Sequence, residues 1–166
     1  PRKRIRAIVI AATAACALAA AAGAFTPTDP EATHPAYAAL GLPAAWELTT
    51  GSPNVIVAVV DSGIDASHPD LAGAVLPGYD FVDEDADASD PPGSGHGTAV
   101  TGVAAARANN GIGGVGACFG CNVMPLRVLG PGGIAFNTNT AEAIDYAVDH
   151  GAAVVNVSLY GERSPR

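Results

Sequence analysis

The sequence is poor in positive charge. Its 166 residues contain 8 Lys and Arg against 16 Asp and Glu, and four of the eight bases lie within the first six residues. From residue 25 onward there are four Arg and no Lys, whereas all 16 acidic residues lie there, which gives this part a formal net charge of −12. Contact with phosphate groups requires clustered Lys and Arg. This deficit therefore argues against nucleic acid and anionic membrane surfaces as partners.

Charged residues of either sign are scarce as well, at 14%, whereas apolar residues make up 49%. A disordered chain has the opposite balance, because it lacks the apolar surface needed to offset the loss of chain entropy. The length is enough for one domain of ordinary size. We therefore expect a folded domain with a buried core.

The N-terminal segment 1–24 combines a basic start with an apolar run. The run from Ala7 to Ala22 has 16 residues, whereas a membrane-spanning helix needs about 20. It ends in Ala22-Gly23-Ala24, and polar residues follow at once. These three parts are typical of a secretory signal peptide. We expect a secreted, extracellular protein with no stable membrane association after signal removal. The alternatives are an uncleaved anchor, a lipid attached at Cys16 and a buried Ala-rich helix.

Three short runs rich in β-branched residues predict β-strands over 54–60, 122–128 and 152–157. Each run is apolar along most of its length, which is typical of strands buried on both faces of a parallel sheet. Helical patterns over 97–108 and 140–150 lie between the strands. This alternation predicts an α/β fold in which helices cover both faces of a parallel sheet.

The remaining segments have less regular patterns. Residues 25–50 are rich in Pro and Thr and form a lead-in to the sheet, with a short helical patch over 43–48. Residues 83–95 form an acidic loop rich in Gly and Pro. For the last predicted helix, Thr140 is the expected N-cap residue and Gly151 lies just past the expected end.

Two residues are placed for acid–base chemistry. Asp61 ends the first predicted strand, where open parallel sheets bind their ligands, and His96 lies between a Gly-rich loop and a predicted helix. A carboxylate beside a His fixes the tautomer of the imidazole and stabilises its charged form while the His removes a proton from a Ser hydroxyl. One Asp and one His alone are weak evidence, because an Asp at a strand end is more often a helix cap or a loop residue.

The residues around this pair resemble the successive motifs of the subtilisin-like serine proteases, the subtilase family. The motifs are VAVVDSGIDASHPDL at 57–71, GHGTAVTGVAA at 95–105, MPLRVL at 124–129 and VVNVSL at 154–159. Their order and spacing are similar to the thermitase-like branch. The resemblance implies a subtilisin-like fold of three layers and a monomeric serine endopeptidase that acts on polypeptides. It also implies that Asp61 is the catalytic aspartate and His96 the general base.

The same resemblance implies two segments that pair with an extended substrate peptide, Gly133-Ile134-Ala135 and Ser158-Leu159-Tyr160. Main-chain hydrogen bonds would hold such a peptide, and pockets would read its alternate side chains. Tyr160 stands where the family usually has Gly, and we expect it to narrow the cleft. An apolar cleft beside Leu129 and Leu159 would favour apolar or aromatic side chains before the cleaved bond.

Two motifs of the family do not occur in this sequence. One is the Gly-Thr-Ser-Met-Ala-like helix start that carries the nucleophilic Ser, and the other contains the Asn of the oxyanion hole. The order of the triad in the family is Asp, His, Ser. We therefore expect residues 51–166 to be the first part of a catalytic domain, incomplete and inactive by itself. The alternative is a non-catalytic peptide-binding module of the same fold, a pseudoprotease.

Calcium is the structural cofactor that the resemblance implies, because carboxylate and carbonyl oxygens suit this hard cation. The tight site of the family corresponds to two side chains and three backbone carbonyls, those of Asp70, Asn110, Ala108, Ile112 and Gly114. Asp29 is a further expected ligand. A second site is expected at Asp80, Asp85 and Asp87, for which a solvated acidic loop is the alternative. An acidic calcium-binding surface protein is a third interpretation of the whole chain.

The sequence has only three Cys, and two of them, Cys118 and Cys121, form a Cys-x-x-Cys pair. Zinc is not expected, because no second pair of Cys or His lies nearby. In an exported protein a short-loop disulfide is the leading interpretation. Two buried thiols and a redox role remain the alternatives.

Overall fold

The computed structural model describes residues 25–159, and these fall into two compact units. The smaller unit contains His34–Thr50 together with residues 25 and 26. The larger unit contains Pro27–Thr33 and the chain from Gly51 onward. The expected lead-in over 25–50 is thus divided between the two units. The expected signal peptide, 1–24, lies outside the described residues.

The smaller unit is built from two short helices, α2 (Pro35–Ala39) and α3 (Leu42–Trp46). Gly41 joins them with a positive φ of 70°. Trp46 is only 3% exposed, and its ring lies 6.1 Å from that of Phe25 and 5.7 Å from that of Tyr37. The helical patch predicted over 43–48 is α3, whereas α2 was not predicted.

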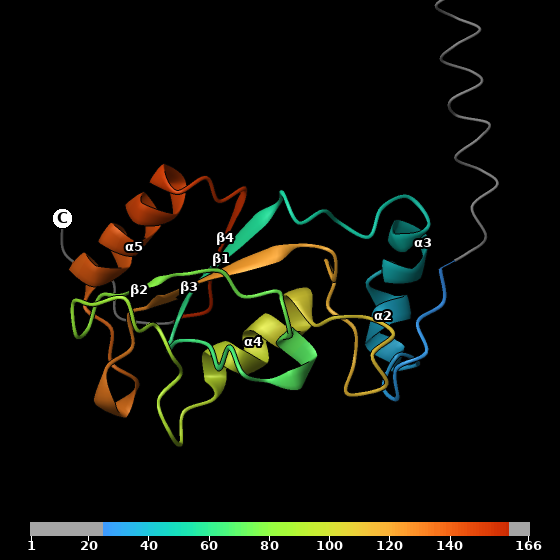
Figure 1. The fold of residues 1–166 in the computed structure, drawn as a ribbon, viewed down its shortest axis with the longest axis horizontal. Helices are drawn as coiled ribbons and strands as arrows, with labels where there is room; N and C mark the ends of the chain where they lie inside the picture. Colours follow the sequence, from blue (N-terminus) through green and yellow to red (C-terminus); the bar gives the residue numbers. More distant parts are fainter. Residues whose placement is uncertain (1–24, 160–166) are drawn as a thin grey trace, which may run out of the picture. The chain divides into compact units, whose positions relative to one another are not determined.

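The larger unit contains a four-stranded sheet in which every pair of neighbouring strands is parallel. The strands are β1 (Ile56–Asp61), β2 (Tyr79–Asp80), β3 (Asn122–Arg127) and β4 (Val154–Val157), and their spatial order is β2-β3-β1-β4 (Figure 1). Three strands and the parallel sheet are therefore confirmed. The register pairs Asp61 with Arg127, so that β1 and β3 end side by side.

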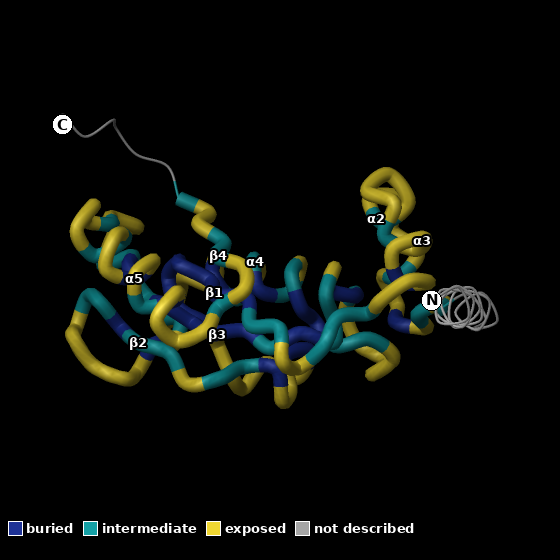
Figure 2. Tube along the Cα trace, turned by 90° about the horizontal axis from the view of Figure 1, so that it is seen from above, coloured by how far each residue is buried: buried dark blue, intermediate teal, exposed yellow. Residues whose placement is uncertain are grey.

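Helices cover the two faces of this sheet. On one face, Val57 and Val59 of β1 belong to a core cluster with Ala105 of α4 (His96–Ala105). On the other face, Ala58 and Val60 belong to a cluster with Ala143 and Ala147, which come from α5 (Asn137–Asp149). Figure 1 shows α4 and α5 on opposite sides of the sheet. The α/β architecture with three layers is confirmed, and the buried residues follow β1 and β3 (Figure 2).

The predicted helix boundaries need correction. The helix expected over 97–108 ends at Ala105, because Ala106 takes an extended conformation and the amides of Ala117 and Cys118 bond to carbonyls of the last turn. The helix expected from Thr140 begins at Asn137. The Thr140 hydroxyl donates a hydrogen bond to the carbonyl of Phe136 instead of capping the helix. The end before Gly151, which has a φ of 80°, is confirmed.

Two 3₁₀ turns complete the regular elements, η1 (Pro69–Leu71) and η2 (Pro131–Gly133). Within the part of the chain that the structure describes, no helix has both the length and the apolar character to cross a membrane.

Candidate active site

Asp61 and His96 meet at the carboxyl edge of the sheet. Asp61 is the last residue of β1, and His96 is the first residue of α4. The Nδ1 atom of His96 lies 2.6 Å from Oδ1 of Asp61. The Asp61 side chain is fully buried, whereas 55% of the imidazole is exposed. A buried carboxylate thus holds one nitrogen of a ring whose remaining surface is open to a substrate.

The close approach of α4 to β1 depends on Gly97. A Cβ atom at Gly97 would lie 2.1 Å from the carbonyl oxygen of Gly63 and 3.2 Å from Cβ of Asp61. No side chain fits at this distance from a backbone atom, so a residue without Cβ is required directly after His96. The sequence Gly95-His96-Gly97 is therefore what lets the helix begin against the strand end.

The two oxygen atoms of the Asp61 carboxylate differ in their hydrogen bonds. Its Oδ1 accepts both the His96 contact and a 2.7 Å hydrogen bond from the Ser62 amide. Its Oδ2 is buried and has no hydrogen-bond partner among residues 25–159. A buried, incompletely solvated anion favours a neighbouring positive charge. The arrangement is therefore suited to stabilise an imidazolium at His96.

Asp90 also contacts this region, although no motif in the sequence selects it. Its Oδ1 accepts hydrogen bonds from the Ser62 hydroxyl (2.9 Å) and the Gly95 amide (3.1 Å). Its Oδ2 accepts from the Thr98 amide (3.1 Å) and hydroxyl (2.7 Å). Burial by itself raises the pKa of Asp90, but the hydrogen bonds from Thr98, Ser62 and Gly95 outweigh it and hold the pKa below its ordinary value.

A cleft of about 470 Å³ lies beside the pair. One wall is formed by residues 91–94 together with Ser62, and the other by Arg127, Leu129 and the Gly-rich turn at residues 130–133. The turn is closed by hydrogen bonds from the Gly130 amide to the Ile134 carbonyl and from the Gly133 amide to the Gly130 carbonyl.

The expected substrate-facing residues are distributed unevenly around this cleft. Gly133 lines it, and Ile134 is 63% exposed next to it in the chain. Ala135 forms an antiparallel bridge with Leu129. Ser158 and Leu159 follow β4 and do not line the cleft, and Tyr160 lies outside the described residues.

Asp29, Asp70 and Asn110 meet at the loop between α4 and β3. The Asn110 side-chain amide donates a 2.8 Å hydrogen bond to Asp70 Oδ1. A Cβ atom at Gly113 would lie 2.3 Å from Asp70 Oδ2, so this loop closes tightly over the carboxylate. Ala108, Ile112 and Gly114 belong to the same loop. The side chains of Asp70 and Asn110 are therefore in contact through the Asn110 nitrogen, while the Asn110 oxygen accepts a 3.1 Å hydrogen bond from the Ile112 amide.

Asp29 holds the backbone of this loop. Its carboxylate accepts hydrogen bonds from the amides of Asn109 (2.6 Å), Asn110 (2.9 Å) and Gly111 (3.1 Å). Burial raises the pKa of Asp29, but these amide donors outweigh it and the pKa lies below its ordinary value. Asp29 thus fixes the loop that carries Asn110.

In the second expected calcium set, Asp80 and Asp85 form an antiparallel bridge through their backbones, but the carboxylates of the set have separate partners. Asp80 is buried and forms an ion pair with Arg127, which also contacts Asp83 at 2.7 Å. Asp85 and Asp87 are exposed and accept hydrogen bonds from amides two residues further along the chain. No group of three or more His, Cys, Asp or Glu in residues 25–159 is arranged to hold a metal. Arg127 thus provides a positive charge next to the Asp80 carboxylate in this structure.

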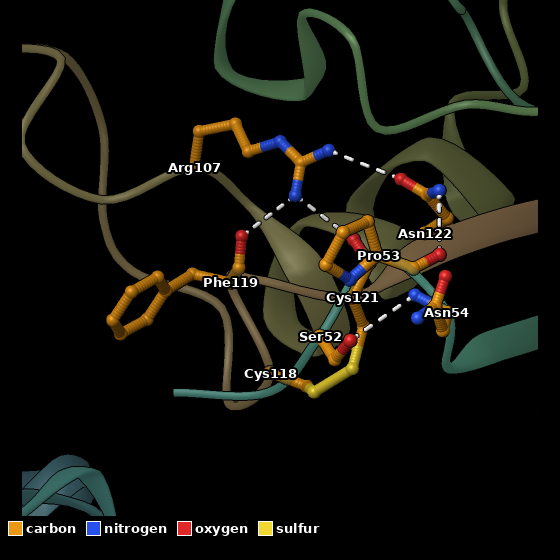
Figure 3. The surroundings of a disulfide bond; sticks show 8 residues. All are labelled: Ser52, Pro53, Asn54, Arg107, Cys118, Phe119, Cys121 and Asn122. Carbon is orange, nitrogen blue, oxygen red and sulfur yellow. Dashed lines mark hydrogen bonds between the residues drawn. A yellow bond between two sulfur atoms is a disulfide. The ribbon is translucent and has the colours of Figure 1, made fainter. Parts of the chain in front are cut away.

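Cys118 and Cys121 form a disulfide in the structure, with Cα atoms 5.4 Å apart (Figure 3). Arg107 donates hydrogen bonds to the carbonyls of Phe119 (2.7 Å) and Cys121 (2.9 Å), and Figure 3 shows its guanidinium above this loop. The Cys118 amide bonds to the Ala104 carbonyl at 2.8 Å. The disulfide loop therefore anchors the C-terminal end of α4, the helix that begins with His96.

Comparison with known proteins agrees with these features. Residues 52–165 match the subtilase family. The thermophilic serine proteinase of Bacillus sp. (strain AK1) is 45% identical over 69% of this chain and 28% of its own length. The thermitase of Thermoactinomyces vulgaris is 40% identical over 82% of this chain and 49% of its own length.

Solved structures show the same similarity. A protease of Pseudoalteromonas arctica superposes with a TM-score of 0.72 and 34% identity, over 81% of this chain and 51% of its own chain. The chain thus spans about half, or less, of the length of the relatives to which it is similar.

Proposed function

This chain belongs to the subtilase family, and we propose that it provides the Asp–His half of the catalytic site of a secreted serine endopeptidase. The observation that carries the proposal is the 2.6 Å contact between His96 Nδ1 and a fully buried Asp61, beside an open cleft. In the proposed reaction, Asp61 orients His96 and stabilises its charged form. His96 removes the proton from a Ser hydroxyl that attacks the peptide carbonyl, and then returns it to the leaving amine.

The nucleophilic Ser is proposed to come from outside residues 25–159. The hydroxyls of Ser62, Ser67 and Ser89 donate to Asp90, Asp65 and Asp87, respectively. None of these three is therefore presented to His96. The exposed face of the imidazole is the side at which a further segment can place a hydroxyl.

The proposed substrates are polypeptides held in extended conformation along residues 133–135, which follow the turn at residues 130–133. Its tight hydrogen bonding fixes the backbone that would pair with the peptide. Leu129 supplies an apolar wall to the cleft. We propose that apolar or aromatic side chains before the cleaved bond fit best, and that a substrate preference for charged side chains at this position would contradict this assignment.

The function is tested on the full-length protein. We expect it to hydrolyse unfolded casein and to be labelled by a fluorophosphonate, which reacts only with an activated Ser. Prior labelling should abolish hydrolysis. Binding of peptides with neither hydrolysis nor labelling would overturn the proposal in favour of a peptide-binding module.

We propose that a structural calcium ion is held at the 108–114 loop by Asp70 and Asn110. Its support is the chemistry of the two side chains, since carboxylate and amide oxygens suit calcium, and the contact between them. In this structure the nitrogen of the Asn110 amide faces Asp70 and its oxygen accepts from the Ile112 amide, so calcium binding would require the Asn110 amide to turn. When bound, calcium would neutralise the Asp70 charge and hold the loop closed. Asp29 would act beside it by fixing the loop amides.

Replacing Asp70 by Asn is expected to remove the stabilisation that calcium gives. At a free calcium concentration 100 times Kd, binding to the folded state alone stabilises it by about 2.7 kcal/mol. Thermal unfolding with calcium and with EGTA measures this difference in the wild type. We expect the difference to vanish in Asp70→Asn and to persist in the control Asp87→Asn, whose carboxylate is exposed in another loop. An equal calcium effect in Asp70→Asn and the wild type would exclude this site.

A further inference from the structure

The N-terminus of α4 lacks a capping side chain of its own. The N-cap residue is Gly95, with a φ of 76°, so it has no oxygen to offer to the amides of the first turn. These amides have no partner within a helix and require acceptors from elsewhere. The requirement matters here because His96 is the first residue of this helix.

Two side chains from other segments supply the acceptors. The Gly97 amide donates to the Ser62 hydroxyl oxygen at 2.9 Å, and the Thr98 amide donates to Asp90 Oδ2 at 3.1 Å. The Ser62 hydroxyl in turn donates to Asp90 Oδ1. Asp90 therefore holds the first turn both directly and through Ser62. Its negative charge is also favourable near a helix N-terminus.

We call the hydrogen bonds that join Asp90, Ser62 and the first turn of α4 the Asp90 bridge. This bridge contacts the residues that directly follow Asp61 and His96. Ser62 follows Asp61 and donates its amide to the carboxylate, and Gly97 follows His96. Because more than half of the imidazole is exposed, packing does little to hold the ring. The position of the first turn of α4 thus sets where Nδ1 lies relative to Asp61.

We propose that Asp90 is a positioning residue for the Asp61–His96 pair, acting through Ser62 and the first turn of α4. The expected effect on catalysis rests on the proposed function, whereas the expected effect on the position of His96 does not. All four groups that contact Asp90 are donors, so both of its oxygens must be acceptors. An Asn has the same shape but only one acceptor oxygen, and it must leave the donors on one side unpaired.

The test compares Asp90→Asn with Asp65→Asn in the full-length protein. Asp65 is an exposed acid near the same helix. Its backbone amide donates to the Thr98 hydroxyl, but its carboxylate bonds to Ser67, so Asp65→Asn removes one charge and leaves the backbone contact to Thr98 in place. The first readout is the low-field NMR resonance of the His96 Nδ1 proton, recorded without substrate. We expect it to shift or broaden away in Asp90→Asn and to persist in Asp65→Asn.

The second readout is the kinetics of peptide hydrolysis. Misplacement of a catalytic group by about 1 Å costs up to about 10²-fold, so we expect a loss of this order in kcat with little change in KM. Ser62→Ala should act in the same direction, and the double variant should lose less than the product of the two single losses, because both act through one bridge.

A folded Asp90→Asn variant with the wild-type resonance and kcat would overturn the inference, and so would equal losses in Asp65→Asn. If Asp90→Asn does not fold, the His96 resonance is measured in Ser62→Ala instead. An unchanged resonance in Ser62→Ala would also overturn the inference. A changed resonance in a protein without peptidase activity would refute the proposed function while supporting the positioning role.

Discussion

Replacing Asp61 by Asn in the full-length protein is expected to lower kcat for peptide hydrolysis by about 10⁴-fold. The reason lies in the crowded Oδ1 atom, which accepts from both His96 Nδ1 and the Ser62 amide. If Asn places its oxygen there, the geometry survives but the buried negative charge is lost. If it places its nitrogen there, two donors face one another and His96 must take the wrong tautomer. Either orientation removes the stabilisation of the imidazolium.

The measurement is kcat on a peptide substrate, with folding checked by circular dichroism. Asp65→Asn is the control, because it removes an acid four residues away that does not contact His96. We expect its kcat to match that of the wild type. An Asp61→Asn variant that keeps a tenth or more of the wild-type kcat would show that Asp61 does not orient the general base.

The main strands of the sheet were predictable because a strand that is buried on both faces has apolar residues at consecutive positions. β1 contributes Val57 and Val59 to one core cluster and Ala58 and Val60 to the other, so none of these four consecutive positions is free to be polar. β2 has only two residues, too few for any pattern. The start of α5 was missed because Phe136, at its N-cap, makes no side-chain cap.

The candidate site was predictable where a local motif carries it and not where distant segments meet. The motifs select Asp61 and His96 directly. Asp90 becomes significant only when Ser62, 28 residues earlier, and Thr98, eight residues later, are brought to it by the fold. The acidic loop was interpreted as a cation site because the sequence alone does not reveal that Arg127 pairs with an acid 47 residues away.

Replacing Gly97 by Ala is expected to disrupt the contact between α4 and β1 that brings His96 to Asp61. The added Cβ would lie 2.1 Å from the Gly63 carbonyl oxygen, and that oxygen belongs to a backbone that cannot rotate away. Overpacking of this kind costs about 1–3 kcal/mol. Because relief requires α4 to move away from β1, His96 would also leave Asp61, and kcat should fall by about 10²-fold or more.

Gly102→Ala in the same helix separates this clash from a general effect of adding a methyl group. A Cβ at Gly102 meets no atom within 4 Å, so the substitution is free of steric cost. Ala is favoured over Gly inside a helix by about 1 kcal/mol. We expect urea unfolding to show Gly102→Ala slightly more stable than the wild type and Gly97→Ala clearly less stable. Equal free energies of unfolding for the two variants would mean that the contact between Gly97 and Gly63 does not position α4, and the geometry of the Asp61–His96 pair would then need another cause.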